Sequence, residues 1–247
     1  MITHQVSING IEVDARYEES AVEEIFLPFL REMTALRERL GRRVLVMLAA
    51  PPGAGKTTLL SFLERLAREH GETADLQALG MDGFHRRQAY LLTHETERDG
   101  RRISMVEIKG APETFDLDAL TRRVRRVAAG ENCPWPIYDR ILRDPVEDAL
   151  TVESGLVLLE GNYLLLDEDG WRDLSGYADY TVFLRAEESF LRPRLIARRV
   201  AAGVDPEEAA RFIDYSDMPN ARLCLEHSLP ADLRLFLTPE GRIVRDE

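Results

Sequence analysis

The stretch with the most chemical content is 50–58, which reads APPGAGKTT. The apolar run VLVMLA comes shortly before it, and LLSFLERLA follows it with the spacing of an amphipathic helix. A glycine-rich loop in that setting turns backbone N–H groups toward an anion, at the positive end of the following helix. The loop matches the pattern GxxxxGK[ST], except that Ala50 stands where the first glycine is usual. We therefore predict a nucleotide-phosphate site here.

Residue types within and near this loop predict how the phosphates are held. Lys56 is predicted to reach the β- and γ-phosphates, and the Thr57 hydroxyl to hold Mg²⁺. Glu160 ends the apolar run LVLLE, and a buried carboxylate needs a cation or donors, so it is a candidate second ligand or water ligand of Mg²⁺. ATP and Mg²⁺ are the expected cofactors. The predicted phosphate-binding residues are Pro52, Gly53, Ala54, Gly55, Lys56, Thr57 and Thr58.

Asp82 follows a second predicted strand in the segment MDGFH. Its carboxylate could take a proton from an acceptor hydroxyl or help to order Mg²⁺. It could equally cap the backbone of an Asp-Gly turn. The residue types alone leave both interpretations open.

Arg194 and Arg198 lie four residues apart in the predicted helix 188–203, so they face the same side of it. Arginines on a mobile helix can close over a transferring phosphoryl group and neutralise its charge. The alternative is a solvated basic stripe, because Arg192 and Arg199 flank the pair. The presence of the phosphate loop favours the first interpretation.

The elements that must position these residues alternate between strand and helix. Continuous apolar strands with helices between them indicate a parallel sheet covered on both faces, with ligands at the carboxyl ends of the strands. Asn9-Gly10 between alternating residues predicts a hairpin, and a helix is predicted over 18–40. We predict an N-terminal hairpin and helix (1–41) and an α/β domain (42–247) with a helical lid around 188–203. The predicted strands are 42–49, 74–84, 155–161, 178–186 and 231–237, and the further helices are 55–70, 112–130 and 205–218.

Composition narrows the class of protein. The chain has 247 residues and a net charge of −12, which argues against a nucleic-acid partner. No apolar run approaches the roughly 18–20 residues that cross a membrane, and no signal peptide is recognised at the N-terminus. Cys133 and Cys224 have no paired spacing and are expected to be buried thiols of a cytoplasmic protein. A homodimer is expected only because dimers are the commonest assemblies.

Six segments in order resemble the uridine kinase, phosphoribulokinase and pantothenate kinase group of P-loop kinases, and the helix 26–43 resembles its N-terminal region. The likeness is greatest to the bacterial branch labelled nucleoside/nucleotide kinase-like or fructose transport system kinase-like, and it covers nearly the whole chain. It implies a P-loop NTPase fold, a three-layer α/β/α arrangement. The segments are LAAPPGAGKTT, MDGFH, KGAPETFD (109–116), PIYDRILRDPVEDA (136–149), LLEGNYLLL and DMPNARL (217–223).

The resemblance also implies roles for individual residues. Asp82 would be the catalytic base, Glu160 the acidic residue at the strand end, and Arg194 and Arg198 the lid arginines that act with Lys56. Asn220 would approach the adenine. The acceptor pocket would be lined by Tyr138, Asp139, Arg140, His85, Lys109 and Asn162.

These features predict an ATP-dependent kinase that phosphorylates a hydroxyl of a small molecule. The polar pocket residues with few aromatic rings favour a sugar or sugar-like polyol, with a nucleoside next. The basic members of the pocket could equally bind a carboxylate or phosphate already on the acceptor. The alternative is a nucleotide-dependent regulatory ATPase without a small-molecule acceptor. Acceptor-dependent release of ADP would separate the two.

Overall fold

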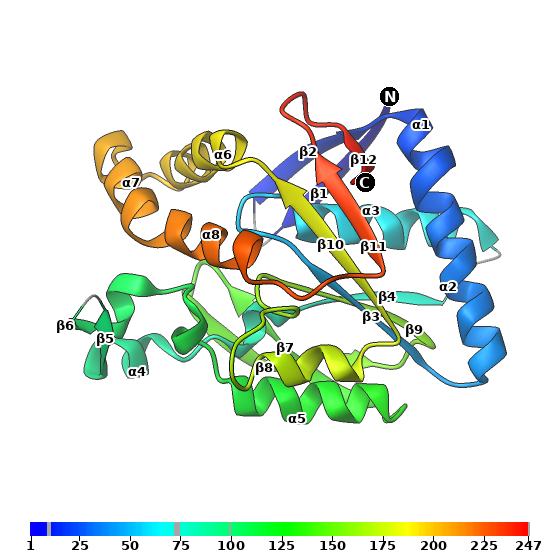
Figure 1. Ribbon diagram of the computed structural model, residues 1–247, viewed down its shortest axis with the longest axis horizontal. Coiled ribbons are helices and arrows are strands. Elements are labelled where there is room, and N and C mark those ends of the chain that lie inside the picture. The colour runs from blue at the N-terminus through cyan, green and yellow to red at the C-terminus, as the bar shows by residue number, and fades with distance from the viewer. Residues whose placement is uncertain (9–10, 72–74, 99, 247) are drawn as a thin grey trace.

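The computed structural model describes residues 1–8, 11–71, 75–98 and 100–246. Its centre is a six-stranded sheet in the order β12-β11-β10-β3-β9-β4 (Figure 1). Five strands are parallel, as predicted, whereas the edge strand β12 pairs antiparallel with β11 and was missed. The strands are β3 (Val44–Ala49), β4 (Leu76–Gly80), β9 (Leu156–Gly161), β10 (Tyr180–Ala186), β11 (Leu233–Leu237) and β12 (Ile243–Arg245).

Helices cover both faces of this sheet. Successive side chains of a strand point to opposite faces, so alternate residues of β3 enter two separate buried clusters. One cluster includes α2 (Leu27–Leu40) and α3 (Lys56–Glu69), and the other includes α5 (Leu117–Ala128). The predicted three-layer α/β/α fold is confirmed.

The N-terminal segment forms the predicted hairpin and helix. Strands β1 (Ile2–Ile8) and β2 (Ile11–Tyr17) are antiparallel, and the turn at Asn9-Gly10 lies outside the described residues. The helix begins as α1 (Glu19–Ala21), passes through the π-helical stretch Val22–Phe26 and continues as α2.

This N-terminal segment packs into the main hydrophobic cluster. The Tyr17 ring stacks on Phe62 of α3 with centroids 4.2 Å apart, and His4 Nε2 lies 3.1 Å from Ser61 Oγ. The hairpin therefore lies against the helix that begins at the phosphate loop. The division at residue 41 stays a prediction about chain organisation.

Two further antiparallel hairpins were absent from the prediction. Strands β7 (Cys133–Asp139) and β8 (Asp144–Val152) form one, and β5 (Glu95–Arg98) and β6 (Arg101–Ser104) form the other, after the short α4 (Gln88–Thr93). The β7–β8 hairpin was not predicted because β7 contains prolines. Proline cannot donate to a strand ladder, so it argues against a strand assignment.

Three helices follow β10, and in Figure 1 they lie above α4, β5 and β6 on the left of the view. The predicted lid helix is α6 (Glu188–Ala201), which agrees with 188–203. The predicted helix 205–218 is α7 (Pro206–Phe212), but the chain continues through a π-helical stretch, Ile213–Asp217, into α8 (Met218–Glu226).

The helix predicted over 112–130 begins later than expected. Pro112–Thr114 forms a separate 3₁₀ turn, and α5 begins at Leu117 because the Asp116 carboxylate caps it by accepting from the backbone N–H of Ala119. Among the described residues, no helix combines the length and the apolar character needed to cross a bilayer. Cys133 and Cys224 are both free and buried.

Candidate functional site

The phosphate loop joins the buried central strand β3 to α3. Gly53 and Gly55 both have φ of +85°, a left-handed conformation that favours glycine, and Gly55 precedes the first residue of α3. A Cβ at Gly53 would lie 3.0 Å from Leu195 Cγ of α6. The loop therefore needs glycine both for its turn and for its contact with the lid helix.

A carboxylate, a hydroxyl and an ammonium group meet at the start of α3. Thr57 Oγ1 donates a 2.6 Å hydrogen bond to Glu160 Oε1, and Lys56 Nζ lies 4.0 Å from Glu160 Oε2. Burial raises the pKa of Glu160, and the positive charge of Lys56 opposes that rise. Oxygen donors of this kind fit Mg²⁺, which commonly takes one or two protein ligands together with phosphate oxygens.

Asp82 lies at the end of β4, in the 3₁₀ turn Met81–Phe84. Its carboxylate forms no hydrogen bond or ion pair with any described residue. Burial alone would raise the pKa of Asp82, but the neighbouring His85 and then the positive charges of Lys56, Arg140 and Arg198 hold it below its usual range. The group is therefore ionised at neutral pH and free to accept a proton.

Close backbone contact fixes this turn against β7. A Cβ at Gly83 would lie 2.2 Å from the carbonyl oxygen of Pro136, so only glycine fits there. Trp135 Nε1 also donates a 2.9 Å hydrogen bond to the carbonyl of Gly80 at the end of β4. The position of Asp82 is thus tied to the hairpin β7–β8.

The same hairpin supplies one wall of the cleft. Tyr138 lies edge-on to His85 with centroids 5.1 Å apart, and Lys109 Nζ is 5.1 Å from the Tyr138 ring centroid. His85 also stacks on Phe115 at 3.9 Å. Burial lowers the pKa of His85 to about 4 and raises that of Tyr138 to about 12, so both are neutral at neutral pH.

Helix α6 forms the opposite wall. Arg194 Nε donates a 3.0 Å hydrogen bond to the carbonyl of Gly53, which joins the lid to the phosphate loop. Arg198 reaches the cleft without a hydrogen bond or ion pair to any described residue, and burial lowers its pKa. Arg199 lies 3.9 Å from the carboxylate of Asp217.

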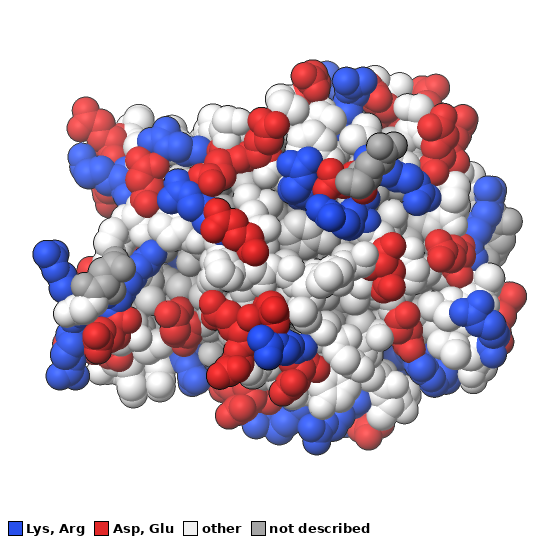
Figure 2. Space-filling view, in the orientation of Figure 1, with Lys and Arg blue, Asp and Glu red and all other residues white. Residues whose placement is uncertain are grey.

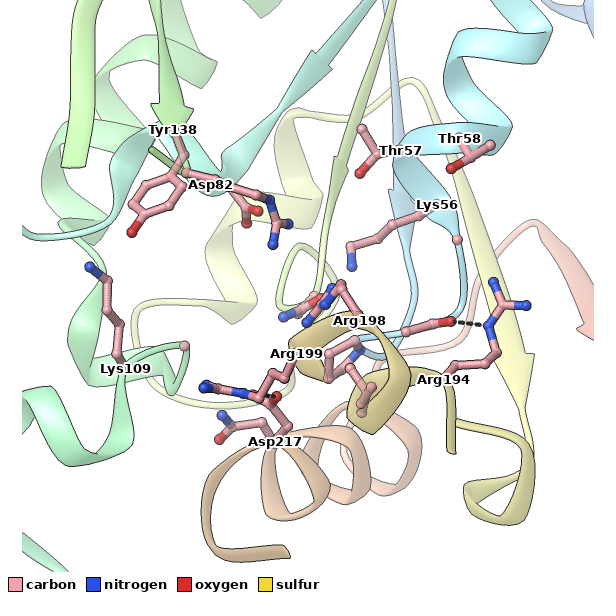
Figure 3. A pocket seen from close by; sticks show the side chains of 18 of the residues that line it. Lys56, Thr57, Thr58, Asp82, Lys109, Tyr138, Arg194, Arg198, Arg199 and Asp217 are labelled. Atoms are coloured by element: carbon pink, nitrogen blue, oxygen red, sulfur yellow. Dashed lines mark hydrogen bonds and ion pairs between the residues drawn. The ribbon is translucent and has the colours of Figure 1, made fainter. Parts of the chain in front are cut away.

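These elements enclose a cleft of about 520 Å³. Figure 3 shows Lys109, Tyr138 and Asp82 on one side of it and Thr57, Thr58 and Arg194 on the other, with Arg198 between them. We call these sides the acceptor end and the phosphate end. The predicted residues that line the cleft are Pro52, Gly53, Gly55, Lys56, Thr57, Thr58, Asp82, His85, Lys109, Tyr138, Arg140, Asn162, Arg194, Arg198 and Asn220.

The Ala54 side chain is buried in the hydrophobic cluster behind the loop, and the predicted role of its backbone stays a prediction. Two predicted residues have different surroundings from those expected. The Asp139 carboxylate accepts from the backbone N–H groups of Ile141 and Leu142, so it shapes the hairpin turn and does not line the cleft. Asn220 Nδ2 lies near Gly110, at the acceptor end, and this placement does not support its expected contact with the adenine.

Sequence reasoning missed Asp217, which lines the cleft from the π-helical stretch before α8. Burial raises the pKa of Asp217, and the charges of Arg198 and Arg199 oppose that rise. A search for a carboxylate to balance the lid arginines would have pointed to the DMPN segment. The roles of all these residues stay predictions.

The fold and the phosphate loop define a P-loop protein of the kinase class. The chain is 41% identical to the uncharacterized protein YggC of Escherichia coli K12, over 96% of this chain and 97% of that one. It is 32% identical to "Putative uridine kinase C227.14" of Schizosaccharomyces pombe, over 78% and 83%. The crystal structure of a "putative fructose transport system kinase" from Silicibacter sp. TM1040 superposes with a TM-score of 0.70 at 30% identity, covering 82% of this chain and 98% of that one.

The family model of the phosphoribulokinase/uridine kinase family matches residues 45–228. The chain therefore belongs to this family. The resemblance stated from its motifs is confirmed.

Proposed function

We propose that the protein is an ATP-dependent kinase that transfers the γ-phosphoryl group to a hydroxyl of a small molecule. One observation carries the proposal: the ionised, unpartnered carboxylate of Asp82 faces the same cleft as Lys56 and the phosphate loop. A phosphate-binding loop alone would serve an ATPase equally well. A free carboxylate opposite it fits a second substrate with a proton to lose.

The proposed transfer is a single in-line displacement. The acceptor oxygen forms a bond to the γ-phosphorus while the bond from that phosphorus to the β,γ-bridging oxygen breaks. The hydroxyl proton passes to Asp82, and ADP leaves with the electron pair of the broken bond. Lys56 and the loop N–H groups orient the phosphates, so positioning and charge stabilisation supply most of the rate enhancement.

The lid and the metal ligands complete this arrangement. Arg198 would neutralise charge on the transferring group, while Arg194 would hold the phosphate loop to α6 through the carbonyl of Gly53. Thr57 and Glu160 would hold a magnesium ion, which would reduce the charge on the β- and γ-phosphates.

The acceptor end favours a sugar or sugar-like polyol. His85, Lys109 and Asn162 offer polar atoms there, and the buried Asn162 Oδ1 has no hydrogen-bond partner among the described residues. Such groups match a ligand with several hydroxyls.

The test is ADP release by the purified protein with Mg²⁺ and ATP, measured with and without sugars, polyols and nucleosides. A kinase releases ADP in proportion to added acceptor, with a phosphorylated product detected by mass spectrometry. ATP hydrolysis that no acceptor changes would instead favour the regulatory ATPase.

A further inference from the structure

Basic side chains are concentrated in the cleft of an otherwise acidic protein. The chain carries a net charge of −12, and on the face shown in Figure 2 acidic and basic side chains are interspersed. Among the described residues that line the cleft, six are basic and two are acidic. The basic ones are Lys56, Lys109, Arg140, Arg194, Arg198 and Arg199, and the acidic ones are Asp82 and Asp217.

The phosphate end and the lid account for part of this charge. Lys56 lies at the loop beside Glu160, and Arg194 is held by the carbonyl of Gly53. Arg199 has a carboxylate partner in Asp217. The remaining three, Lys109, Arg140 and Arg198, have no carboxylate within ion-pair distance among the described residues.

Arg140 and Arg198 enter the cleft from different elements. Arg140 follows β7, whereas Arg198 belongs to α6. Neither guanidinium makes a hydrogen bond or ion pair with a described residue. Burial and the charge of Arg140 lower the pKa of Arg198, and the more distant charges of Asp217 and Asp82 oppose this. Like charges that share a partly desolvated space repel, and a bound anion would relieve the repulsion.

Arg140 and Lys109 both line the cleft, and the charges of both act on His85. Lys109 Nζ donates to Gln88 Oε1 at 2.7 Å and to the carbonyl of Arg143 at 2.9 Å, which fixes its position. Arg143 has φ of +57°, an unfavourable conformation for a non-glycine residue, and this conformation brings its carbonyl to Lys109. His85 lies within the influence of both cations, whose charges add to burial in keeping it neutral.

We infer that the acceptor carries a phosphate or carboxylate group in addition to the hydroxyl that is phosphorylated, and that Arg140 and Lys109 bind this anion. Arg198, on the lid, is left for the transferring phosphoryl group. The inference rests on the proposed function, because it names the chemical class of the acceptor of that reaction.

The first experiment compares pairs of acceptors in which an anionic group replaces one hydroxyl of the neutral member and the other hydroxyls are kept. The probes are ribose and ribose 5-phosphate, fructose and fructose 6-phosphate, and sugar alcohols with the corresponding aldonic acids. At least one charged member is expected to show kcat/KM roughly 30-fold or more above that of its neutral partner. Sugar phosphates and aldonic acids distinguish phosphate from carboxylate as the anion.

The second experiment changes Arg140. For the charged acceptor, Arg140→Ala should raise KM at least about 30-fold while the KM for ATP stays within twofold, and Arg140→Lys should recover part of the loss. For the neutral partner Arg140→Ala should have little effect. The matched control is Arg87→Ala, because Arg87 makes an exposed ion pair with Glu147 of the same hairpin.

Binding measured by calorimetry with a non-hydrolysable ATP analogue separates this inference from the proposed function. If charged compounds bind through Arg140 but are never phosphorylated, the proposed kinase activity is contradicted and the inferred anion site is retained. If neutral acceptors are phosphorylated with the same efficiency as charged ones, the inferred anion site is contradicted and the proposed kinase activity is retained. Absence of both binding and turnover across the panel would overturn both.

Discussion

The two ends of the cleft differ in how their polar groups are held. At the phosphate end the loop backbone supplies the donors, and Lys56, Thr57 and Glu160 already interact with one another. At the acceptor end Lys109 donates to Gln88 and to the carbonyl of Arg143, whereas Asp82 and Arg140 make no hydrogen bond or ion pair with any described residue.

This difference indicates how much each end depends on its ligand. A network of paired groups keeps its geometry without phosphate, because each member already has a partner. Unpaired charges carry a desolvation free energy that only a bound ligand offsets. The acceptor end would therefore select a ligand of complementary charge. Under the proposed function, the phosphate end would serve a constant ligand and the acceptor end would determine specificity.

The sharpest test of the comparison is Asp82→Asn. Because the amide cannot take the hydroxyl proton, turnover should fall roughly 10²–10⁴-fold, measured as acceptor-dependent ADP release. The affinity for ATP, measured by calorimetry, should remain within twofold. Asp139→Asn is the matched control, since that carboxylate serves the hairpin turn; near-normal turnover in Asp82→Asn would remove Asp82 from the role of base.

A somewhat smaller effect is expected for Arg198→Ala. Loss of a positive charge from the transferring phosphoryl group should lower kcat roughly 10²–10³-fold. Arg192→Ala on the same helix is the control, because Arg192 forms an exposed ion pair with Asp214 at 2.7 Å. Equal losses in the two variants would mean that the helix as a whole is affected and that Arg198 has no special role.

The acceptor end can be tested through the pH dependence of stability that His85 causes. Its pKa falls from 6.5 to about 4 on folding, so between these values the unfolded chain binds a proton that the folded protein does not. Stability therefore rises with pH through this window, and His85 alone should make the protein about 2 kcal/mol less stable at pH 5 than at pH 7. Thermal unfolding of His85→Gln should have a correspondingly smaller pH slope; identical slopes would contradict a buried, neutral His85.

The smallest effect is expected at the phosphate end, from Arg194→Ala. Its one hydrogen bond to the Gly53 carbonyl supports a loop that the backbone already shapes, so the KM for ATP should rise about 2–10-fold with kcat little changed. Steady-state kinetics at saturating acceptor measure this. A loss as large as that of Arg198→Ala would show that the phosphate end depends on its side chains as much as the acceptor end does.

The same contrast explains what the sequence could predict. The phosphate loop is contiguous, and its chemistry follows from nine residues between a strand and a helix. The acceptor end gathers Asp82, Lys109 and Arg140 from distant segments that no spacing relates, so only the family resemblance predicted them together, and Asp217 was missed. The prolines of β7 concealed the hairpin that carries Arg140, and no sequence pattern indicates the π-helical stretch that carries Asp217.

The contact between Gly83 and Pro136 limits how this cleft could acquire a new specificity. A shift of the hairpin large enough to admit a different acceptor would also displace the aspartate beside that glycine. Descendants of this chain that change their substrate are therefore expected to exchange individual side chains along the hairpin while leaving its main-chain path intact.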